Sequence, residues 1–201
     1  MVTKAVPLPV HRLDVETYGR MVASGALDGE RFELLEGWLV DMSPHSPGHS
    51  AVVGRLTRHL AGAQAWLLVQ LPLEIPPSSA PEPDLALVEE EPSSERHPST
   101  ALLVVEVAVS SHEADRGVKA RLYAKTGVPT YWLVDVPGEA VEVRTDPGVE
   151  GYRACETYAV GASVPSPAEG VMDLDVRSLF ERAGAWASVS SPGSTTRSSL
   201  K

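Results

Sequence analysis

An acidic residue, Glu106, lies in the middle of the apolar run formed by residues 101–109. The run is short, rich in β-branched residues and bounded by polar segments, which predicts a strand that is buried on both faces. A carboxylate at the centre of such a strand must be paired, hydrogen-bonded, protonated or bound to a metal, because burying an isolated charge is very costly. Glu106 is therefore the first candidate for a chemical role, and an ion pair inside the sheet is the structural alternative.

Three further charged residues extend this candidate site. Asp84 opens the preceding apolar run, 84–88, although acids at the start of a strand are also common without a function. Lys119 lies on the next predicted helix, where the alternative is a solvated lysine paired with Asp115 four residues earlier. Glu33 lies in an earlier predicted hairpin and could be an outward-facing acid. Two strand carboxylates with a nearby lysine are the parts of a metal-dependent site that cleaves phosphodiester bonds.

Histidines are the second set of residues with possible chemistry. His45 and His49 are four residues apart, as in a helical metal site, but the prolines and glycine around them indicate a loop, so helical geometry is not assured. We interpret His49 as a residue at the start of the following helix, at the edge of the site. The other histidines have no partner spacing. The sequence contains no HExxH motif, no P-loop and no dinucleotide-binding glycine pattern.

The composition is that of an ordinary globular protein with excess acidic charge. The 201 residues suffice for one well-buried domain or two small ones, and 43% of them are hydrophobic. The net charge of −10 argues against a broad basic surface for nucleic acid. However, the 17 basic residues could still cluster locally, and a bound divalent metal would offset acidic charge at the site.

Nothing in the sequence predicts a membrane protein or a disulfide scaffold. No apolar stretch approaches the length of a membrane span, and the N-terminus lacks the apolar core of a signal peptide. Cys155 is the single cysteine, which excludes an internal disulfide and a cysteine zinc cluster. We therefore expect a soluble, cytoplasmic protein with no membrane partner.

The elements that would position the candidate residues alternate between helices and strands. The first part of the chain predicts a helix within 11–23 with Asp14 as its N-cap, a hairpin over 31–42 and a loop at 43–48. The next helix has an apolar face made of Val52, Val53, Leu56, Leu60 and Ala63.

The later part of the chain predicts mostly strands. These lie at 66–75, from Asp84, around Glu106, at 130–135, at 139–144, and near 151–159 and 171–175. Helices are expected from about 113 to 126, ending at Gly127, and at 176–185. This order predicts the α/β class, with one domain over residues 1–187 and a mixed central sheet flanked by helices. Residues 188–201 are rich in Ser, Thr and Gly and predict a disordered tail.

Several short motifs, taken in their order and spacing, form a larger pattern. They are Arg31-Phe32-Glu33-Leu34-Leu35-Glu36-Gly37, Ser43-Pro44, His49, Pro83-Asp84-Leu85-Ala86-Leu87-Val88, Val105-Glu106-Val107, Asp115-Arg116-Gly117-Val118-Lys119, Leu122-Tyr123-Ala124, Gly127-Val128-Pro129 and Tyr131-Trp132-Leu133-Val134-Asp135. Together they resemble the bacterial restriction-endonuclease family that is placed in the PD-(D/E)XK nuclease superfamily. The resemblance covers about residues 11 to 180.

The resemblance implies a restriction-endonuclease-like core whose acids bind Mg²⁺ or Mn²⁺. Asp84 would match the motif aspartate, Glu106 the second acid and Glu33 the N-terminal acid of the family. The motif lysine normally lies two residues after the second acid, but Ala108 occupies that position here. In this family the lysine is moved to the following helix, and Lys119 fits that place.

The resulting hypothesis is a metal-dependent endonuclease that hydrolyses phosphodiester bonds, with DNA as the substrate. Asp84 and Glu106 would hold one ion, Glu33 would complete the site or hold a second, and Lys119 would orient the attacking water. The alternative is a non-catalytic nuclease-fold module for binding or assembly, suggested by the acidic charge and by Ala108. A glycosidase-type carboxylate pair is a third class, for which nothing specifies a sugar site.

Many nucleases that cut both strands of DNA act as pairs, so a homodimer is possible. The apolar hairpin with Trp38 and the strand with Trp132 could supply its interface.

Overall fold

The first helix and hairpin follow the local signals in the sequence. In the computed structural model, which describes residues 10–181, helix α1 spans Val15–Ala23. The Oδ1 atom of Asp14 accepts the backbone N–H of Thr17 at 2.7 Å, which confirms the predicted N-cap. Strands β1, Phe32–Leu35, and β2, Trp38–Asp41, pair in the antiparallel direction and confirm the predicted hairpin.

The centre of the fold is a six-stranded sheet in the order β3-β4-β5-β6-β7-β8. Its strands are β3 (Trp66–Val69), β4 (Leu85–Val88), β5 (Leu103–Ala108), β6 (Thr130–Asp135), β7 (Ala140–Gly148) and β8 (Gly151–Ala159). Only β5 and β6 pair in parallel, and every other neighbouring pair is antiparallel. The sheet is therefore mixed, and the predicted α/β class is confirmed.

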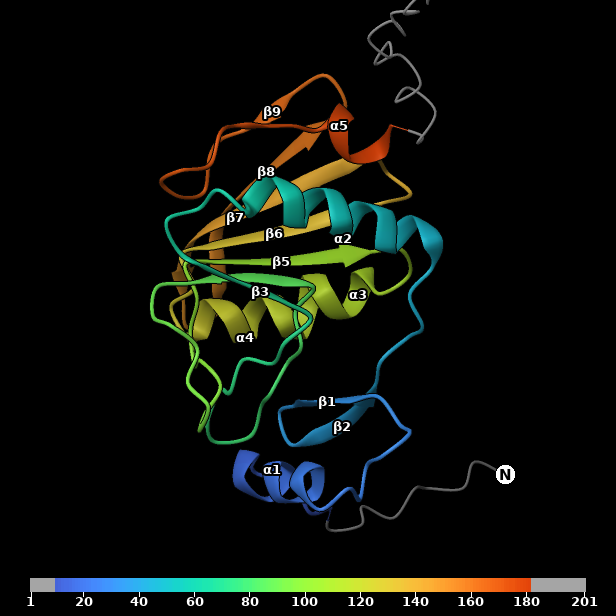
Figure 1. Cartoon of the computed structure of the whole chain (residues 1–201), viewed down its shortest axis with the longest axis vertical. Helices are drawn as coiled ribbons and strands as arrows, with labels where there is room; N and C mark the ends of the chain where they lie inside the picture. The colour runs from blue at the N-terminus through green and yellow to red at the C-terminus, as the bar shows by residue number, and fades with distance from the viewer. Residues whose placement is uncertain (1–9, 182–201) are drawn as a thin grey trace, which may run out of the picture.

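Helices cover both faces of the sheet (Figure 1). Helix α2, Pro47–Leu60, packs on one face, where its apolar residues join Val105 and Val107 in one buried cluster. A helical segment after β5 packs on the other face, in a second buried cluster with Val104 and Ala108. Side chains alternate along a strand, so Glu106 points to this second face.

The helical segment after β5 has three parts. It comprises α3, His112–Ala114, the π-helix η1, Asp115–Lys119, and α4, Ala120–Lys125. The single helix expected over about 113–126 is thus interrupted by a wider turn. A π-helix adds a residue within a turn and is frequent at functional sites, because it shifts the direction of the side chains that follow.

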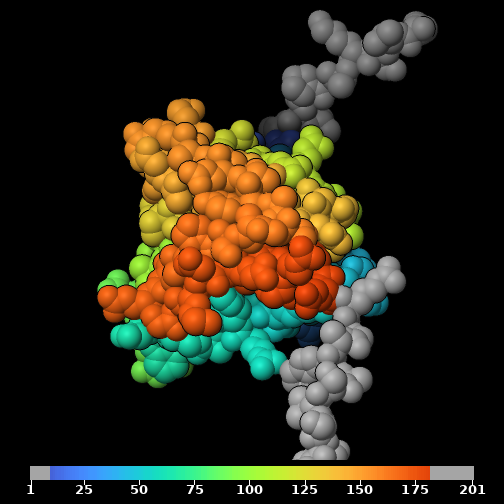
Figure 2. Space-filling view, turned by 90° about the horizontal axis from the view of Figure 1, so that it is seen from above, coloured from blue at the N-terminus to red at the C-terminus, as the bar shows by residue number. Residues whose placement is uncertain are grey.

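The C-terminal elements lie beside α2. Strands β9, Ser163–Val164, and β10, Leu174–Asp175, form a short antiparallel pair, and α5 spans Arg177–Phe180. Figure 2 shows these orange and red segments next to the teal surface of the α2 region. On α2, Arg55 donates to the backbone oxygens of Leu179 and Glu181, which fixes this end of the chain against the domain.

Three sequence expectations differ from the structure or fall outside it. The strand expected over 66–75 ends at Val69, because Gln70 adopts a left-handed backbone conformation with φ of 51°. Trp132 is buried in the core and cannot lie at a dimer interface, whereas Trp38 is exposed. The expected tail, 188–201, lies outside the described residues. No helix within residues 10–181 is long and apolar enough to cross a membrane.

Candidate active site

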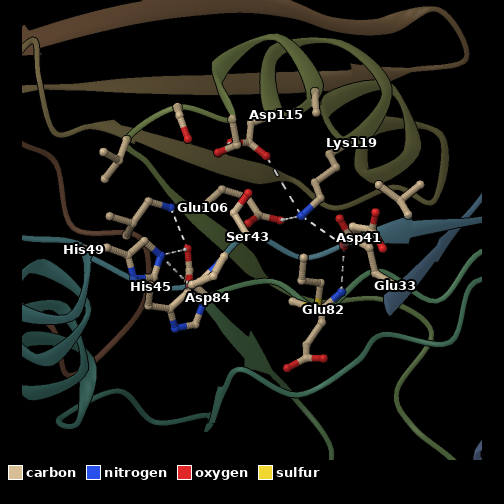
Figure 3. Close-up of a pocket in the computed structure, with 18 of the residues that line it drawn as sticks. Glu33, Asp41, Ser43, His45, His49, Glu82, Asp84, Glu106, Asp115 and Lys119 are labelled. Carbon is tan, nitrogen blue, oxygen red and sulfur yellow. Dashed lines mark hydrogen bonds and ion pairs between the residues drawn. The ribbon is translucent and has the colours of Figure 1, made fainter. Parts of the chain in front are cut away.

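Three carboxylates from separate elements line one cavity of about 390 Å³. Glu33 lies on β1, Asp84 precedes β4 and Glu106 lies within β5. All three are buried, with 4 to 7% of their surface exposed. Figure 3 shows them together with Lys119 around this cavity. The structure therefore brings together the four residues that the sequence singled out.

The pairing of β4 with β5 explains the position of Asp84. Leu85 lies opposite Val105, so the residue before β4 lies next to Glu106 and Val107. The backbone N–H of Val107 donates to Oδ2 of Asp84 at 2.8 Å. The side chain of Asp84 thus accepts a hydrogen bond from a backbone N–H of β5, which fixes its carboxylate beside Glu106.

Lys119 is the central cation of the site. Its Nζ lies 3.0 Å from Oε2 of Glu33 and 3.2 Å from Oε1 of Glu106. Asp115 Oδ1 is farther away, at 3.9 Å. A solvated lysine paired mainly with Asp115 is therefore wrong for this residue, since Lys119 is buried and its two shorter contacts reach other elements. Lys119 thus reaches Glu106 from the helical segment that follows β5.

Burial dominates the electrostatics of Glu106. Removal from water raises the pKa of this carboxyl well above its usual value of 4.5, and Lys119 only partly opposes the shift. The nearby carboxylates of Asp115, Asp84 and Glu33 raise the pKa further. The pKa of Asp115 is also raised, chiefly by burial. The site thus holds more buried negative charge than one lysine can balance.

Asp84 and Lys119 remain charged for different reasons. Burial alone would raise the pKa of Asp84, but hydrogen bonds from His49 and from the Val107 N–H hold it below 3.8. Burial alone would lower the pKa of Lys119, but the carboxylates of Glu106 and Glu33 raise it above its usual 10.5. Both residues are therefore ionised at neutral pH.

Sequence reasoning missed one direct partner of Glu106. The Tyr123 hydroxyl donates to Oε1 of Glu106 at 2.8 Å, the same oxygen that contacts Lys119. Tyr123 follows Lys119 by four residues, so the two side chains lie on one helix face. That spacing was the available signal, but an apolar stripe alone explained Tyr123 equally well.

The two histidines lie on the other side of Asp84. His49 is in the first turn of α2, as expected, and its Nε2 lies 3.0 Å from Oδ1 and 3.1 Å from Oδ2 of Asp84. His45 precedes the helix, and its ring stacks on that of His49 with the centroids 4.2 Å apart. Gln70 was also missed, and its amide lies 3.0 Å from Nδ1 of His45. Its role depends on the fold, and no local pattern signals it.

The comparison with protein families agrees with this geometry. The model of the family described as Uma2, putative restriction endonuclease, matches residues 15–177. The chain belongs to the Uma2 family. The match covers α1 through the start of α5 and so includes every residue of the cavity described above.

A solved structure has a fold similar to that of this chain. It is a putative nuclease belonging to DUF820 from Anabaena variabilis, with 16% sequence identity and a TM-score of 0.65. The alignment covers 84% of this chain and 97% of that one. No curated protein matches. The family match and the shared fold support a nuclease.

Proposed function

We propose that this Uma2-family protein is an endonuclease that hydrolyses phosphodiester bonds in DNA with Mg²⁺ or Mn²⁺. One observation carries the proposal: Lys119 joins Glu33 and Glu106 at 3.0 and 3.2 Å in the cavity that Asp84 also lines. Three hard oxygen donors with an adjacent buried lysine form the arrangement that the reaction requires.

The donor set fits a hard divalent ion. The ligands would be Asp84, Glu106 and Glu33, and Mg²⁺ binds through carboxylate oxygens while keeping several waters. An ion would also offset burial and the neighbouring carboxylates, which together raise the pKa of Glu106. When bound, it would supply a water of lowered pKa and stabilise charge on the phosphate.

Other side chains of the protein would stabilise charge and orient the proposed ligands. Lys119 is charged and buried, and it would stabilise negative charge that develops on the phosphate and orient the attacking water. Tyr123 and Lys119 both contact Oε1 of Glu106 and hold that carboxylate in one orientation. Val107 and His49 hold Asp84 in the same way.

Plasmid nicking tests this proposal. Wild type should nick supercoiled DNA when Mg²⁺ or Mn²⁺ is added and should stop when EDTA is added. Asp84→Asn should lose at least about 100-fold, the upper end of what removing an outer-shell partner costs. Asp28→Asn changes an exposed acid by the same chemistry and should retain activity. Equal nicking by wild type and Asp84→Asn would sink the assignment.

A non-catalytic module with the nuclease fold is the second candidate. The net charge of −10 favours it, because polyanionic DNA must approach an acidic protein. Calorimetry with Mn²⁺ separates the two functions. If the site is vestigial, no heat of binding should be measured at millimolar Mn²⁺, and the metal should not stabilise the protein. A homodimer, suited to cutting both strands, is part of the catalytic proposal, and sedimentation velocity of the purified protein tests it.

A further inference from the structure

The cavity carries a second group of ligand-type side chains beside the carboxylate site. One ligand atom each from His45, His49 and Asp84 lie within 4.8 Å of one another. Figure 3 shows the two histidines and Asp84 on one side of the cavity, with Lys119 and Glu33 on the other. Asp84 is shared by the two groups of ligands.

The spacing of this group suits a single ion. Nε2 of His49 and Oδ1 of Asp84 are 3.0 Å apart. Two ligands that each lie about 2.0–2.2 Å from one zinc ion in a tetrahedral site are separated by little more than this. A ligand nitrogen of His45 lies within 4.8 Å of both of these residues' ligand atoms, and its ring is stacked on that of His49 at an interplanar angle of 19°.

The surrounding protein leaves one nitrogen of the His49 ring without a partner. Nδ1 of His49 is buried and has no hydrogen-bond partner within the described residues. A neutral imidazole nitrogen is the commonest metal ligand among protein side chains. Asp84 supplies the carboxylate ligand of this group.

Gln70 supports the group from the adjacent strand end. Its Nε2 lies 3.0 Å from Nδ1 of His45 and 3.4 Å from Oδ1 of Asp84. Its backbone has a φ of 51°, which is costly for a residue with a side chain. In metal sites, residues outside the ligand set commonly orient the ligands by hydrogen bonding to them, and Gln70 contacts two ligands at once.

The ligand types separate this group from the carboxylate site. Imidazole ligands favour Zn²⁺, Co²⁺ and Ni²⁺, whereas carboxylates and water favour Mg²⁺ and Mn²⁺. We propose that His45, His49 and Asp84 bind a transition-metal ion of the zinc class, as a second cation site beside the Mg²⁺ or Mn²⁺ site. The inference rests on the proposed function only in sharing Asp84 as a ligand.

Cobalt is the probe that tests this site, because its visible absorption reports ligand type and coordination number without any activity. The full chain is freed of metal with EDTA, dialysed and titrated with Co²⁺, and the affinity is confirmed with Zn²⁺ by calorimetry. Wild type should bind one ion. His45→Ala and His49→Gln should each weaken binding by more than about 10-fold, since losing a ligand costs more than losing an outer-shell partner.

Two control variants sharpen the result. His97→Ala removes an exposed imidazole and should bind Co²⁺ as wild type does, which excludes adventitious binding to a surface histidine. Glu106→Gln alters the carboxylate site alone and should also retain Co²⁺. The melting temperature of each variant in EDTA shows whether it folds. His45 is only half-buried, so His45→Ala can still test the site if His49→Gln unfolds.

The outcomes distinguish this inference from the proposed nuclease. Co²⁺ affinity that is unchanged in folded His45→Ala, or no Co²⁺ binding by wild type at millimolar metal, overturns the histidine site. If Co²⁺ binds through the histidines while Mg²⁺ and Mn²⁺ support no nicking, the second site stands and the nuclease proposal fails. If Mg²⁺ supports nicking but Co²⁺ does not bind, the nuclease proposal stands and the histidine site fails.

Discussion

The excess of buried negative charge predicts that Glu106→Gln stabilises the metal-free protein at neutral pH. Glutamine has the same length as glutamate, and its Oε1 can still accept from the Tyr123 hydroxyl and from Lys119. Lys119 keeps its ion pair with Glu33 at 3.0 Å. The substitution therefore removes a repelled charge and retains the contacts, which makes a gain in stability the expected result.

The magnitude follows from the raised pKa of Glu106. In the unfolded chain this carboxyl loses its proton near its usual pKa of 4.5, whereas the folded state holds the proton to a higher pH. The folded protein then binds more protons than the unfolded one, so stability falls as pH rises through this window. The decline is about 1.4 kcal/mol for each pH unit until Glu106 ionises in the folded state.

Urea unfolding in EDTA, at several pH values from 4 to 8, measures this difference. The curves of wild type and Glu106→Gln should lie parallel below the unfolded-state pKa of 4.5 and diverge above it, with the variant more stable. Excess Mg²⁺ should reverse the order, because the ion binds the ionised carboxylate and stabilises wild type alone. Glu150→Gln, at an exposed position, is the matched control and should follow wild type. Parallel curves over the whole range would refute the charge-excess reasoning.

Three further substitutions test the packing around the site by urea unfolding. Lys119→Met should cost about 3–5 kcal/mol, because it leaves buried carboxylates without a countercharge, while exposed Lys125→Met should cost little. Tyr123→Phe should cost about 1.5–3 kcal/mol through its lost bond to Glu106, and a cost under about 0.5 kcal/mol would contradict that bond. Leu56→Ala, in the α2 core, should cost about 2–5 kcal/mol, and an unchanged midpoint would contradict its burial.

Much of the fold could be predicted because local signals in this chain agree with one another. The Asp14 cap, the hairpin at 31–42 and the apolar strand around Glu106 each depend on neighbours in the sequence. Boundaries were less accurate where tertiary contacts decide them. The strand from Trp66 stops at Gln70, whose left-handed backbone accompanies contacts with His45 and Asp84.

The four charged candidates were found by residue type and context, but their arrangement was not. A π-helix over Asp115–Lys119 was not anticipated, although it is the segment from which Lys119 reaches Glu33 and Glu106. His49 was predicted to lie at the edge of the site, but its contact with Asp84 was not predicted. This contact forms only where the start of α2 packs next to the start of β4, and no local pattern in the sequence predicts that packing.

The order of residues along the chain was enough to predict a carboxylate buried in a central strand and an alternation of helices and strands. It was also enough to show motifs that resemble one nuclease family. These properties follow from apolar periodicity and from the order of short motifs, which act locally. The pairing of Lys119 was different, because Lys119 lies closer to Glu33 and Glu106 than to its helix neighbour Asp115, and this depends on the folded arrangement. Such pairs join residues that are remote along the chain, so packing of the sheet, hairpin and helix selects them, and local propensity cannot.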